Sequence, residues 1–423
     1  MGEERLPLPL ASPEELGFSE NRMARIRPAM QKYIDDGKVP NFVTLVARRG
    51  HLVHFDAQGY MDIDTRTPAE RSTLFRLYSN TKPITGVATM ILFEEGLLTL
   101  DDPISKYIPA FENLEVRLPD QPMLTEPARR EITIRDCLAH TSGLATQSRA
   151  PLQYRTLYRD VMEALGWLDS PNGEGESVGS RPYDPRQRVE TLAKLPLNFH
   201  PGTAWEYHVG FPVMSAVLEI VAGMPLDRFY RERIFDPLAM HDSDFYVDES
   251  KLSRFPPCYL PRQDGDRWTL SVSEEAATSE KILGPKTFFG AGGDRGGVVC
   301  TAGDYARFGQ MLLSGGELDD VRILGRKTVE LMTANHIGDV VSPMTGPGVG
   351  FGMGVSVRTG VGGLPSLSSI GTYGWGGAAG TTYFADPKEE LLCVCFTQVL
   401  RHRLIPENDY GTEFQRLVYQ ALV

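Results

Sequence analysis

The chain has 423 residues, of which 41% are hydrophobic and 23% are charged, so disorder is not expected and a sizeable core can be buried. Its length suggests two lobes or one large domain. The formal net charge is −12 and the chain has no run rich in lysine or arginine, which argues against nucleic acid and anionic membrane surfaces as partners.

The N-terminal residues contain no apolar stretch of signal-peptide length, and nowhere do 18 uncharged apolar residues run together. We therefore expect neither a secretory signal nor a membrane span. Five cysteines are an odd and small number for this length, which argues against a disulfide scaffold. Cys393 and Cys395 alternate in "LLCVCFTQV" and should point to one face of a strand. These features predict buried thiols in a reducing cytoplasm, and they set no oligomeric state.

The N-terminal part of the chain predicts two helices and a β-hairpin. Gly50 lies between two runs rich in β-branched and aromatic residues, which is typical of a hairpin. Gly96 follows an apolar segment with helical spacing and should end a helix. In chain order we expect a helix over 20–37, strands over 41–49 and 51–60, a strand-like run over 72–80 and a helix over 81–95.

The middle of the chain is rich in helices and loops. Residues 212–223 and 226–235 have helical spacing. The polar segment "SPNGEGESVGSRPYDP", residues 170–185, predicts a loop and is the best candidate for a mobile segment.

The last third is rich in strands. Apolar or alternating runs separated by Gly, Pro and Asp predict an antiparallel meander, and a final amphipathic helix is expected over 412–422. The runs are 350–358, 366–375, 381–387 and 390–399.

Together these elements predict an α/β (α+β) fold with an antiparallel sheet flanked by helices. The sheet should join the first hairpin to the last strands, within a discontinuous lobe made of residues 1–99 and 291–423. Residues 100–290 would then form an inserted, mainly helical lobe. A cleft between two such lobes is a natural ligand site.

Ser79 and Lys82 stand at the start of the apolar helix, in "RLYSNTKPITGVATMILFEEG". Residues three apart share one face of a helix, so the two side chains should meet. A serine hydroxyl is a weak nucleophile until a nearby group takes its proton, and a lysine can do so only when uncharged. Burial and a helix N-terminus both disfavour the ammonium form. Ser79 is the only serine in the chain with lysine three positions on, although such a pair alone could also be a helix cap beside a solvated lysine.

Two later stretches strengthen the catalytic interpretation. "HPGTAWEYHVGF" places Tyr207 on a turn before an apolar helix. "GTYGWGGAAGTTYF" places Trp375, Gly376 and Gly377 at a strand edge, where glycines let a backbone N–H approach a ligand closely. An oxyanion hole needs such a donor, and each donor contributes roughly 3–4 kcal/mol to the transition state.

The order of these motifs resembles the serine β-lactamase and penicillin-binding-protein superfamily, and within it the class C type and the family VIII carboxylesterases. The resemblance runs over nearly the whole chain. It is carried by "YSNTKPIT", "LDDPISKYIP", "HTSGL", "PGTAWEYHVGF", "LDRFYRERIFDPLAMHDSDF", "TAGDYARFGQMLLSGGELDDVRIL" and "YGWGGAAGTTYFADP".

By this resemblance Ser79 is the acylated nucleophile, and Lys82 and Tyr207 share the proton transfers, with the base of acylation left open. The resemblance implies the β-lactamase/transpeptidase-like fold and places the oxyanion donors at the backbone N–H groups of Ser79 and Ala378. Trp375 would line the acyl or leaving-group pocket together with Gly376 and Gly377. It implies a small-molecule ester as substrate and requires no metal or cofactor.

Two departures from the family pattern bear on the substrate. The second motif reads Tyr207-His208-Val209, without the usual Asn, and the third reads Trp375-Gly376-Gly377 in place of Lys-Thr-Gly. The missing lysine would have supplied a cation for the carboxylate of a β-lactam or a D-Ala-D-Ala peptide. The sequence therefore predicts an esterase for neutral acyl esters of short to medium chain length.

Other interpretations stay open at this point: a β-lactamase or D-Ala-D-Ala peptidase of the same fold, an acyltransferase to an alcohol, and a binding protein without catalysis. His208 could touch substrate. His140, in the turn of "HTSGL", is expected to be structural. The glycine-rich segment 292–297 should form a close-packed turn lining the cleft, without phosphate, because no P-loop lysine follows it.

Overall fold

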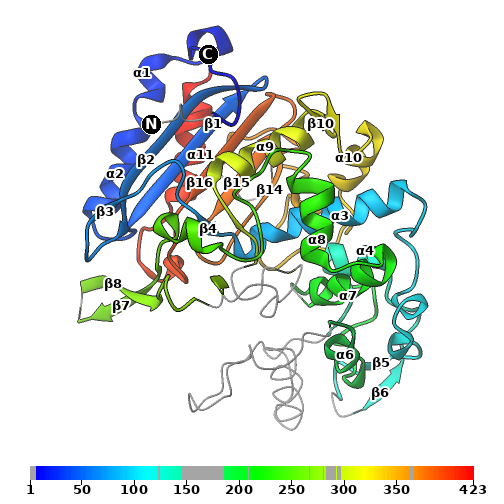
Figure 1. Cartoon of the computed structure of the whole chain (residues 1–423). Helices are drawn as coiled ribbons and strands as arrows, with labels where there is room; N and C mark the ends of the chain where they lie inside the picture. Colours follow the sequence, from blue (N-terminus) through cyan, green and yellow to red (C-terminus); the bar gives the residue numbers. More distant parts are fainter. Residues whose placement is uncertain are drawn as a thin grey trace.

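The computed structural model describes residues 6–121, 124–144, 185–207, 209–265, 267–279, 281–282, 292, 297–361 and 366–423. An antiparallel sheet lies at its centre, in the strand order β12-β13-β14-β15-β16-β1-β2-β3 (Figure 1). β1 pairs with both β2 and β16, so the expected union of the first hairpin with the last strands is confirmed. The strands are β1 Asn41–Arg48, β2 His51–Asp62, β3 Thr67–Pro68, β12 Val349–Phe351, β13 Ser356–Arg358, β14 Tyr373–Gly376, β15 Thr382–Asp386 and β16 Leu391–Phe396.

The strand β16 shows why the centre of this sheet is apolar throughout. All six of its residues are buried, because both faces of the sheet are covered. Cys393 and Cys395 point to the face that packs on α11 (Tyr410–Ala421), whereas Leu392 and Val394 point to the opposite face, towards α9 (Ala302–Leu313). All five cysteines are free and buried, as expected.

The prediction of a single helix over 20–37 is wrong, because this segment forms two helices. The structure has two helices, α1 Glu20–Met23 and α2 Ile26–Asp35, which pack with α11 on the same face of the sheet (Figure 1). The break has a local cause, because Pro28 lacks the N–H that would bond the carbonyl of Ala24, and its ring would clash with that carbonyl. The last helix begins at Tyr410, two residues before the expected start.

The other face of the sheet carries α3 (Thr81–Glu94), α9 and α10 (Arg326–Met332). The middle of the chain adds α4 Ile134–Ala139, α6 Pro185–Glu190, α7 Gly210–Ala222 and α8 Leu226–Tyr230, which runs into a π-helical turn over Arg231–Phe235. Its described residues form the hairpins of β5 Glu115–Arg117 with β6 Thr125–Pro127, and of β7 Cys258–Asp264 with β8 Arg267–Glu274. The second of these projects away from the body of the molecule (Figure 1). Short pairs are also formed by β4 Phe75–Arg76 with β9 Val299–Cys300 and by β10 Glu317–Leu318 with β11 Val321–Arg322.

The described part of the middle segment contains both helices and hairpins, and the mainly helical lobe over 100–290, with its boundaries at 99/100 and 290/291, stays a prediction. The polar segment 170–185 lies outside the described residues apart from its last position. One continuous cluster of buried side chains contains residues from α3, α7, α9 and β16, so the middle of the chain shares its core with the sheet.

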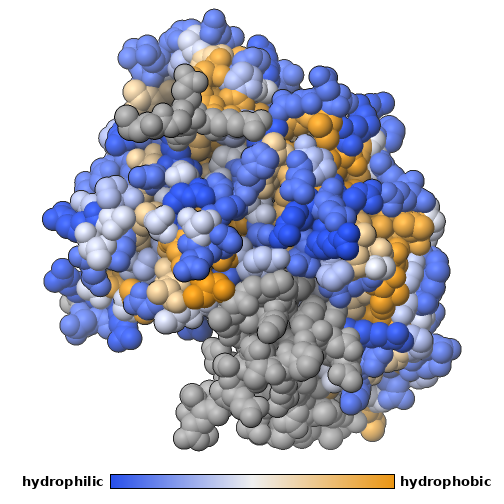
Figure 2. Space-filling view, viewed as in Figure 1, coloured by the Kyte–Doolittle hydropathy of each residue, from blue (hydrophilic) through white to orange (hydrophobic). Residues whose placement is uncertain are grey.

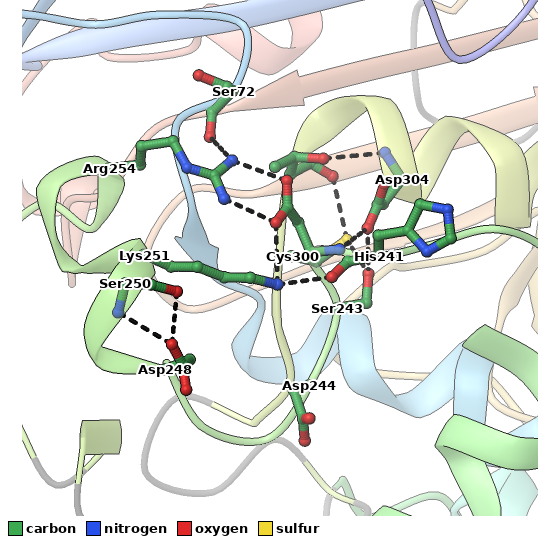
Figure 3. A network of polar contacts seen from close by, with 12 residues as sticks. Ser72, His241, Ser243, Asp244, Asp248, Ser250, Lys251, Arg254, Cys300 and Asp304 are labelled. Atoms are coloured by element: carbon green, nitrogen blue, oxygen red, sulfur yellow. Dashed lines mark hydrogen bonds and ion pairs between the residues drawn. The ribbon is translucent and has the colours of Figure 1, made fainter. Parts of the chain in front are cut away.

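A polar network attaches the segment 241–254 to α9 and, through Arg254, to the backbone carbonyl of Ser72 before β4 (Figure 3). Both terminal nitrogens of Arg254 bond the carboxylate of Asp242 at 2.7 Å, and Lys251 Nζ lies 3.0 Å from the same group. Asp304, in the first turn of α9, accepts hydrogen bonds from the backbone N–H of Asp242 at 2.8 Å and the hydroxyl of Ser243 at 2.9 Å. Bidentate, partly buried contacts of this kind hold a segment in register.

On the face shown in Figure 2, hydrophobic residues form separate patches between hydrophilic ones. Within the described ranges, no single helix is long and apolar enough to cross a bilayer, and only α7 with Leu226–Phe235 passes that test, as a pair bent by 76°. The same ranges contain no group of three or more His, Cys, Asp or Glu side chains placed to hold a metal ion.

Candidate active site

Ser79 lies on a 3₁₀ turn, Tyr78–Asn80, between β4 and α3. The preceding strand is fixed on one side, because Phe75 pairs with Cys300 and the N–H of Leu77 bonds the carbonyl of Val298 at 2.8 Å. Tyr78 then adopts a left-handed backbone conformation with φ of 47°, which is rare for a bulky residue. Such a conformation costs roughly 1–3 kcal/mol and persists only where the surroundings enforce it.

The packing around Tyr78 contributes to that enforcement. Its side chain is half-buried, its hydroxyl lies 4.0 Å from Cys258 Sγ, and desolvation raises its pKa well above the ordinary value. The strained turn therefore presents Ser79 at the start of α3 in one fixed orientation.

Lys82 is fully buried in the first turn of α3, and its Nζ donates to Ser79 Oγ at 3.1 Å. The same nitrogen donates to the backbone carbonyl of Gly292. It lies 4.7 Å from the ring centre of Tyr207 and 5.3 Å from that of Phe211. The predicted contact between Ser79 and Lys82 is thus present, with aromatic rings around the amine.

Tyr207 lies on the turn before α7, as the sequence indicates, and its oxygen accepts a hydrogen bond from Trp375 Nε1 at 2.9 Å. The two rings lie 5.5 Å apart between centroids. Indole nitrogen can only donate, so the phenol oxygen is the acceptor and the phenol proton must point to another group. Trp375 therefore orients Tyr207 in addition to walling the cavity.

Further aromatic groups hold Tyr207 in place. Trp205 stacks on it with ring centroids 5.8 Å apart, and the ring centroid of His140 lies 4.7 Å from that of Tyr207. His140 is buried at the C-terminal end of α4 with φ of 65°, and its carbonyl accepts from the N–H of Glu206 at 2.9 Å. These contacts agree with the structural role predicted for His140, and they show that it supports the ring of Tyr207.

The segment after β14 that carries the predicted oxyanion donor, Ala378, packs directly against the backbone just before Ser79. A Cβ on Gly377 would lie 2.2 Å from the carbonyl oxygen of Leu77, so only glycine fits. Thr381 Oγ1 donates to that same carbonyl at 3.0 Å. Ala378 follows Gly377 and lies on the cavity wall with Ser79. The roles of the N–H groups of Ser79 and Ala378 stay predictions, which this proximity supports.

A cavity of about 570 Å³ brings most of the predicted residues together. Its wall includes Ser79, Tyr207, Trp375, Gly376, Gly377 and Ala378. Lys82 lies behind Ser79, in the core. His208 is outside the described residues. Of the glycine-rich segment 292–297, which was expected to line the cleft, only Gly292 and Gly297 are described. The carbonyl of Gly292 accepts a hydrogen bond from Lys82, which agrees with that expectation.

Two contacts of the site were missed by sequence reasoning: the carbonyl of Gly292 on Lys82, and the indole N–H of Trp375 on Tyr207. The sequence pattern places the glycine-rich segment beside the cleft and Trp375 in the pocket wall. Nothing in the local pattern of either stretch names its partner.

Comparisons with known proteins agree with this geometry. The family model described as Beta-lactamase matches residues 26–411. Protein Rv1367c of Mycobacterium tuberculosis is 34% identical over 383 residues, which cover 88% of each chain. Esterase EstB of Burkholderia gladioli is 28% identical over 86% of this chain and 87% of its own. Among solved structures, "EstCE1, a hydrolase with promiscuous acyltransferase activity" aligns with a TM-score of 0.75 and 26% identity, over 95% of this chain and 99% of that one.

Proposed function

Because the chain belongs to the β-lactamase family, we propose that it is a serine carboxylesterase of the family VIII kind, acting on neutral acyl esters of short to medium chain length. One observation carries the proposal: Lys82 Nζ lies 3.1 Å from Ser79 Oγ, at a cavity walled by Tyr207 and Trp375.

In the proposed reaction Ser79 Oγ attacks the ester carbonyl, and its proton passes to Lys82 or Tyr207. The developing oxyanion is stabilised by the N–H groups of Ser79 and Ala378. The alcohol leaves after taking a proton back from the same pair. Water then attacks the acyl-enzyme by the reverse proton path and releases the acid.

The surroundings of the reacting carbonyl favour esters over β-lactams and D-Ala-D-Ala peptides. Those substrates carry a carboxylate close to the scissile bond, where the family's usual motif offers a lysine. Here the corresponding side chain is Trp375, whose one polar hydrogen is used by Tyr207. A carboxylate at that place would lose water without gaining a cation, which is unfavourable.

A fluorophosphonate probe followed by peptide mass spectrometry tests the nucleophile. We expect one adduct on Ser79 and none in Ser79→Ala. In parallel, turnover of a short-chain nitrophenyl ester should greatly exceed turnover of nitrocefin. A marked preference for nitrocefin would identify a lactamase, and the absence of an adduct on Ser79 would identify a binding protein.

Acyl transfer to an alcohol is a second candidate, because EstCE1 is described as having promiscuous acyltransferase activity and the two chains are 26% identical. Its test is product analysis during ester turnover with added short alcohols. A new ester that grows with alcohol concentration would establish transfer, and free acid alone would exclude it.

A further inference from the structure

The short strand that leads to the nucleophile, β4, has one edge without a neighbouring strand among the described residues. Its other edge pairs with β9, where the N–H of Leu77 bonds the carbonyl of Val298 at 2.8 Å. Arg76 lies on the uncovered edge and is completely buried. A buried backbone N–H or carbonyl without a partner is costly, so both groups of Arg76 need a partner from elsewhere in the chain.

The side chain of Gln398 occupies the place of a strand on that edge. Its Oε1 accepts a hydrogen bond from the backbone N–H of Arg76 at 2.7 Å, and its Nε2 donates to the carbonyl of Arg76 at 3.3 Å. A carboxamide carries the same kinds of donor and acceptor as a peptide group, so one side chain satisfies both. Gln398 is completely buried and fixes the backbone three residues before Ser79.

The backbone around Gln398 is itself fixed to the segment after β14. The N–H of Val399, the next residue, bonds the carbonyl of Ala379 at 2.8 Å. On the other side, the carbonyl of Gln398 accepts a hydrogen bond from the N–H of Tyr259 at 3.0 Å. Ala379 directly follows Ala378, whose N–H is one of the two proposed oxyanion donors. Gln398 and the residue after it therefore hold both segments that carry these donors.

The two segments also touch directly at a second place. Thr381 Oγ1 donates to the carbonyl of Leu77 at 3.0 Å, and Gly377 packs on that carbonyl too closely for any side chain. One contact fixes the separation of two segments but leaves them free to turn about it. The second contact, through Gln398, removes that freedom.

An oxyanion hole depends on the relative position of its donors. Each N–H must lie roughly 2.7–3.1 Å from the oxygen that becomes negative in the transition state. A displacement of about 1 Å in a catalytic group can lower the rate about 100-fold. The segments of Ser79 and Ala378 therefore need to be held more exactly than other neighbouring parts of the backbone.

We propose that Gln398 is a positioning residue that sets the spacing of the two oxyanion donors, the N–H groups of Ser79 and Ala378. The inference rests on the proposed esterase function, and Gln398 itself is not part of the cavity wall. Without its carboxamide, β4 is free to shift against the segment after β14, and the donors no longer converge on one oxygen. The transition state needs this convergence and the bound ester does not. Gln398 therefore acts on kcat and not on KM.

The test compares Gln398→Met with the wild type and with Gln58→Met, a matched control. Gln58 is a buried glutamine of β2 whose Nε2 bonds the carbonyl of Arg27 in α2 at 3.0 Å. Labelling to completion with the fluorophosphonate counts the active sites. Because kcat is then expressed per labelled Ser79, a fraction of unfolded protein does not lower it, and a merely structural role leaves it unchanged.

Inhibition by a trifluoromethyl ketone gives a second measure of the oxyanion hole. Ser79 Oγ adds to the carbonyl carbon of the ketone, the hydroxyl proton passes to Lys82 or Tyr207, and the carbonyl oxygen becomes an oxyanion. No bond of the ketone breaks other than the carbonyl π bond, so the adduct forms reversibly. Its inhibition constant therefore reports the two donors in the absence of turnover.

For Gln398→Met we expect kcat per active site to fall roughly 10- to 100-fold while KM stays within about twofold. The inhibition constant of the ketone should rise by the same factor, and Gln58→Met should keep all three values. An unchanged kcat, a loss expressed in KM, or an equal loss in Gln58→Met overturns the inference and leaves the esterase intact. If the wild type hydrolyses no ester and the fluorophosphonate leaves Ser79 unlabelled, the proposed function itself fails.

Should Gln398→Met not fold, Gln398→Glu decides. This variant keeps the oxygen that accepts from the N–H of Arg76, with the guanidinium of Arg76 beside it, and loses the donor to the carbonyl of Arg76. We expect kcat per active site to fall roughly 2- to 13-fold, the range for one hydrogen bond between neutral groups, with KM unchanged. A kcat equal to that of the wild type overturns the inference.

Discussion

Replacement of Trp375 by phenylalanine probes how the phenol is activated. The change keeps an aromatic ring at the cavity wall and removes the N–H that lies 2.9 Å from the Tyr207 oxygen. A hydrogen bond between neutral groups contributes about 0.5–1.5 kcal/mol, which corresponds to a loss of roughly 2- to 13-fold. A bond to a charged oxygen contributes about 1.5–3 kcal/mol, or roughly 13- to 160-fold. The size of the loss therefore reports whether Tyr207 carries negative charge in the transition state.

The assay combines steady-state turnover of a short-chain nitrophenyl ester with the rate of fluorophosphonate labelling, which reports acylation alone. We expect both rates to fall within the ranges above for Trp375→Phe. Trp268→Phe, in the projecting β7–β8 hairpin, is the matched control and should keep both rates.

A double-mutant cycle with Tyr207→Phe isolates the contact. In the Tyr207→Phe background the indole has no phenol to orient, so Trp375→Phe should cost little further activity. A loss of the same size in both backgrounds would refute the reasoning and would show that the indole acts on the substrate. Rates unchanged in Trp375→Phe would refute it as well.

Three further changes test other parts of the site and fold. Lys82→Arg replaces the amine with a guanidinium that cannot give up its proton, so fluorophosphonate labelling of Ser79 should fall at least roughly 100-fold while the melting temperature stays near that of the wild type; rapid labelling would contradict a role for an uncharged amine. Gly377→Ala places a methyl group 2.2 Å from the carbonyl of Leu77 and should lower kcat roughly 100-fold, whereas Gly376→Ala, whose Cβ meets its nearest atom at 3.5 Å, should have a smaller effect; equal effects would contradict the steric argument. Burial raises the pKa of Asp304 to about 6 from 3.8. The protonated carboxyl group therefore stabilises the fold fully below pH 4, and this stabilisation is lost as the pH rises through 6. The loss in the free energy of unfolding is roughly 3 kcal/mol. Urea unfolding between pH 4 and 8 should show this loss in the wild type and a flatter profile in Asp304→Asn, and parallel profiles would contradict it.

The sequence predicted those features that depend on neighbours along the chain. The contact of Ser79 with Lys82 follows from a spacing of three residues at the head of a helix, and the structure has it at 3.1 Å. The helix Thr81–Glu94 was predicted to within one residue, because its apolar run ends at a glycine. The break before α2 was also local, and Pro28 could have revealed it.

Features that join distant parts of the chain were not predicted. Trp375 and Tyr207 are 168 positions apart, and no periodicity in either stretch encodes their hydrogen bond. The arginines on the cavity wall were missed for the same reason, since Arg358 lies on β13 whereas Arg401 and Arg403 lie between β16 and α11.

The hydrogen bond between Trp375 and Tyr207 also sets the order in which the site is completed during synthesis. The serine and its lysine emerge early in synthesis, whereas the indole that sets the phenol arrives almost 300 residues later, by the difference between positions 79 and 375. A growing chain thus lacks the hydrogen bond that orients Tyr207 until β14 has been made and has joined the sheet.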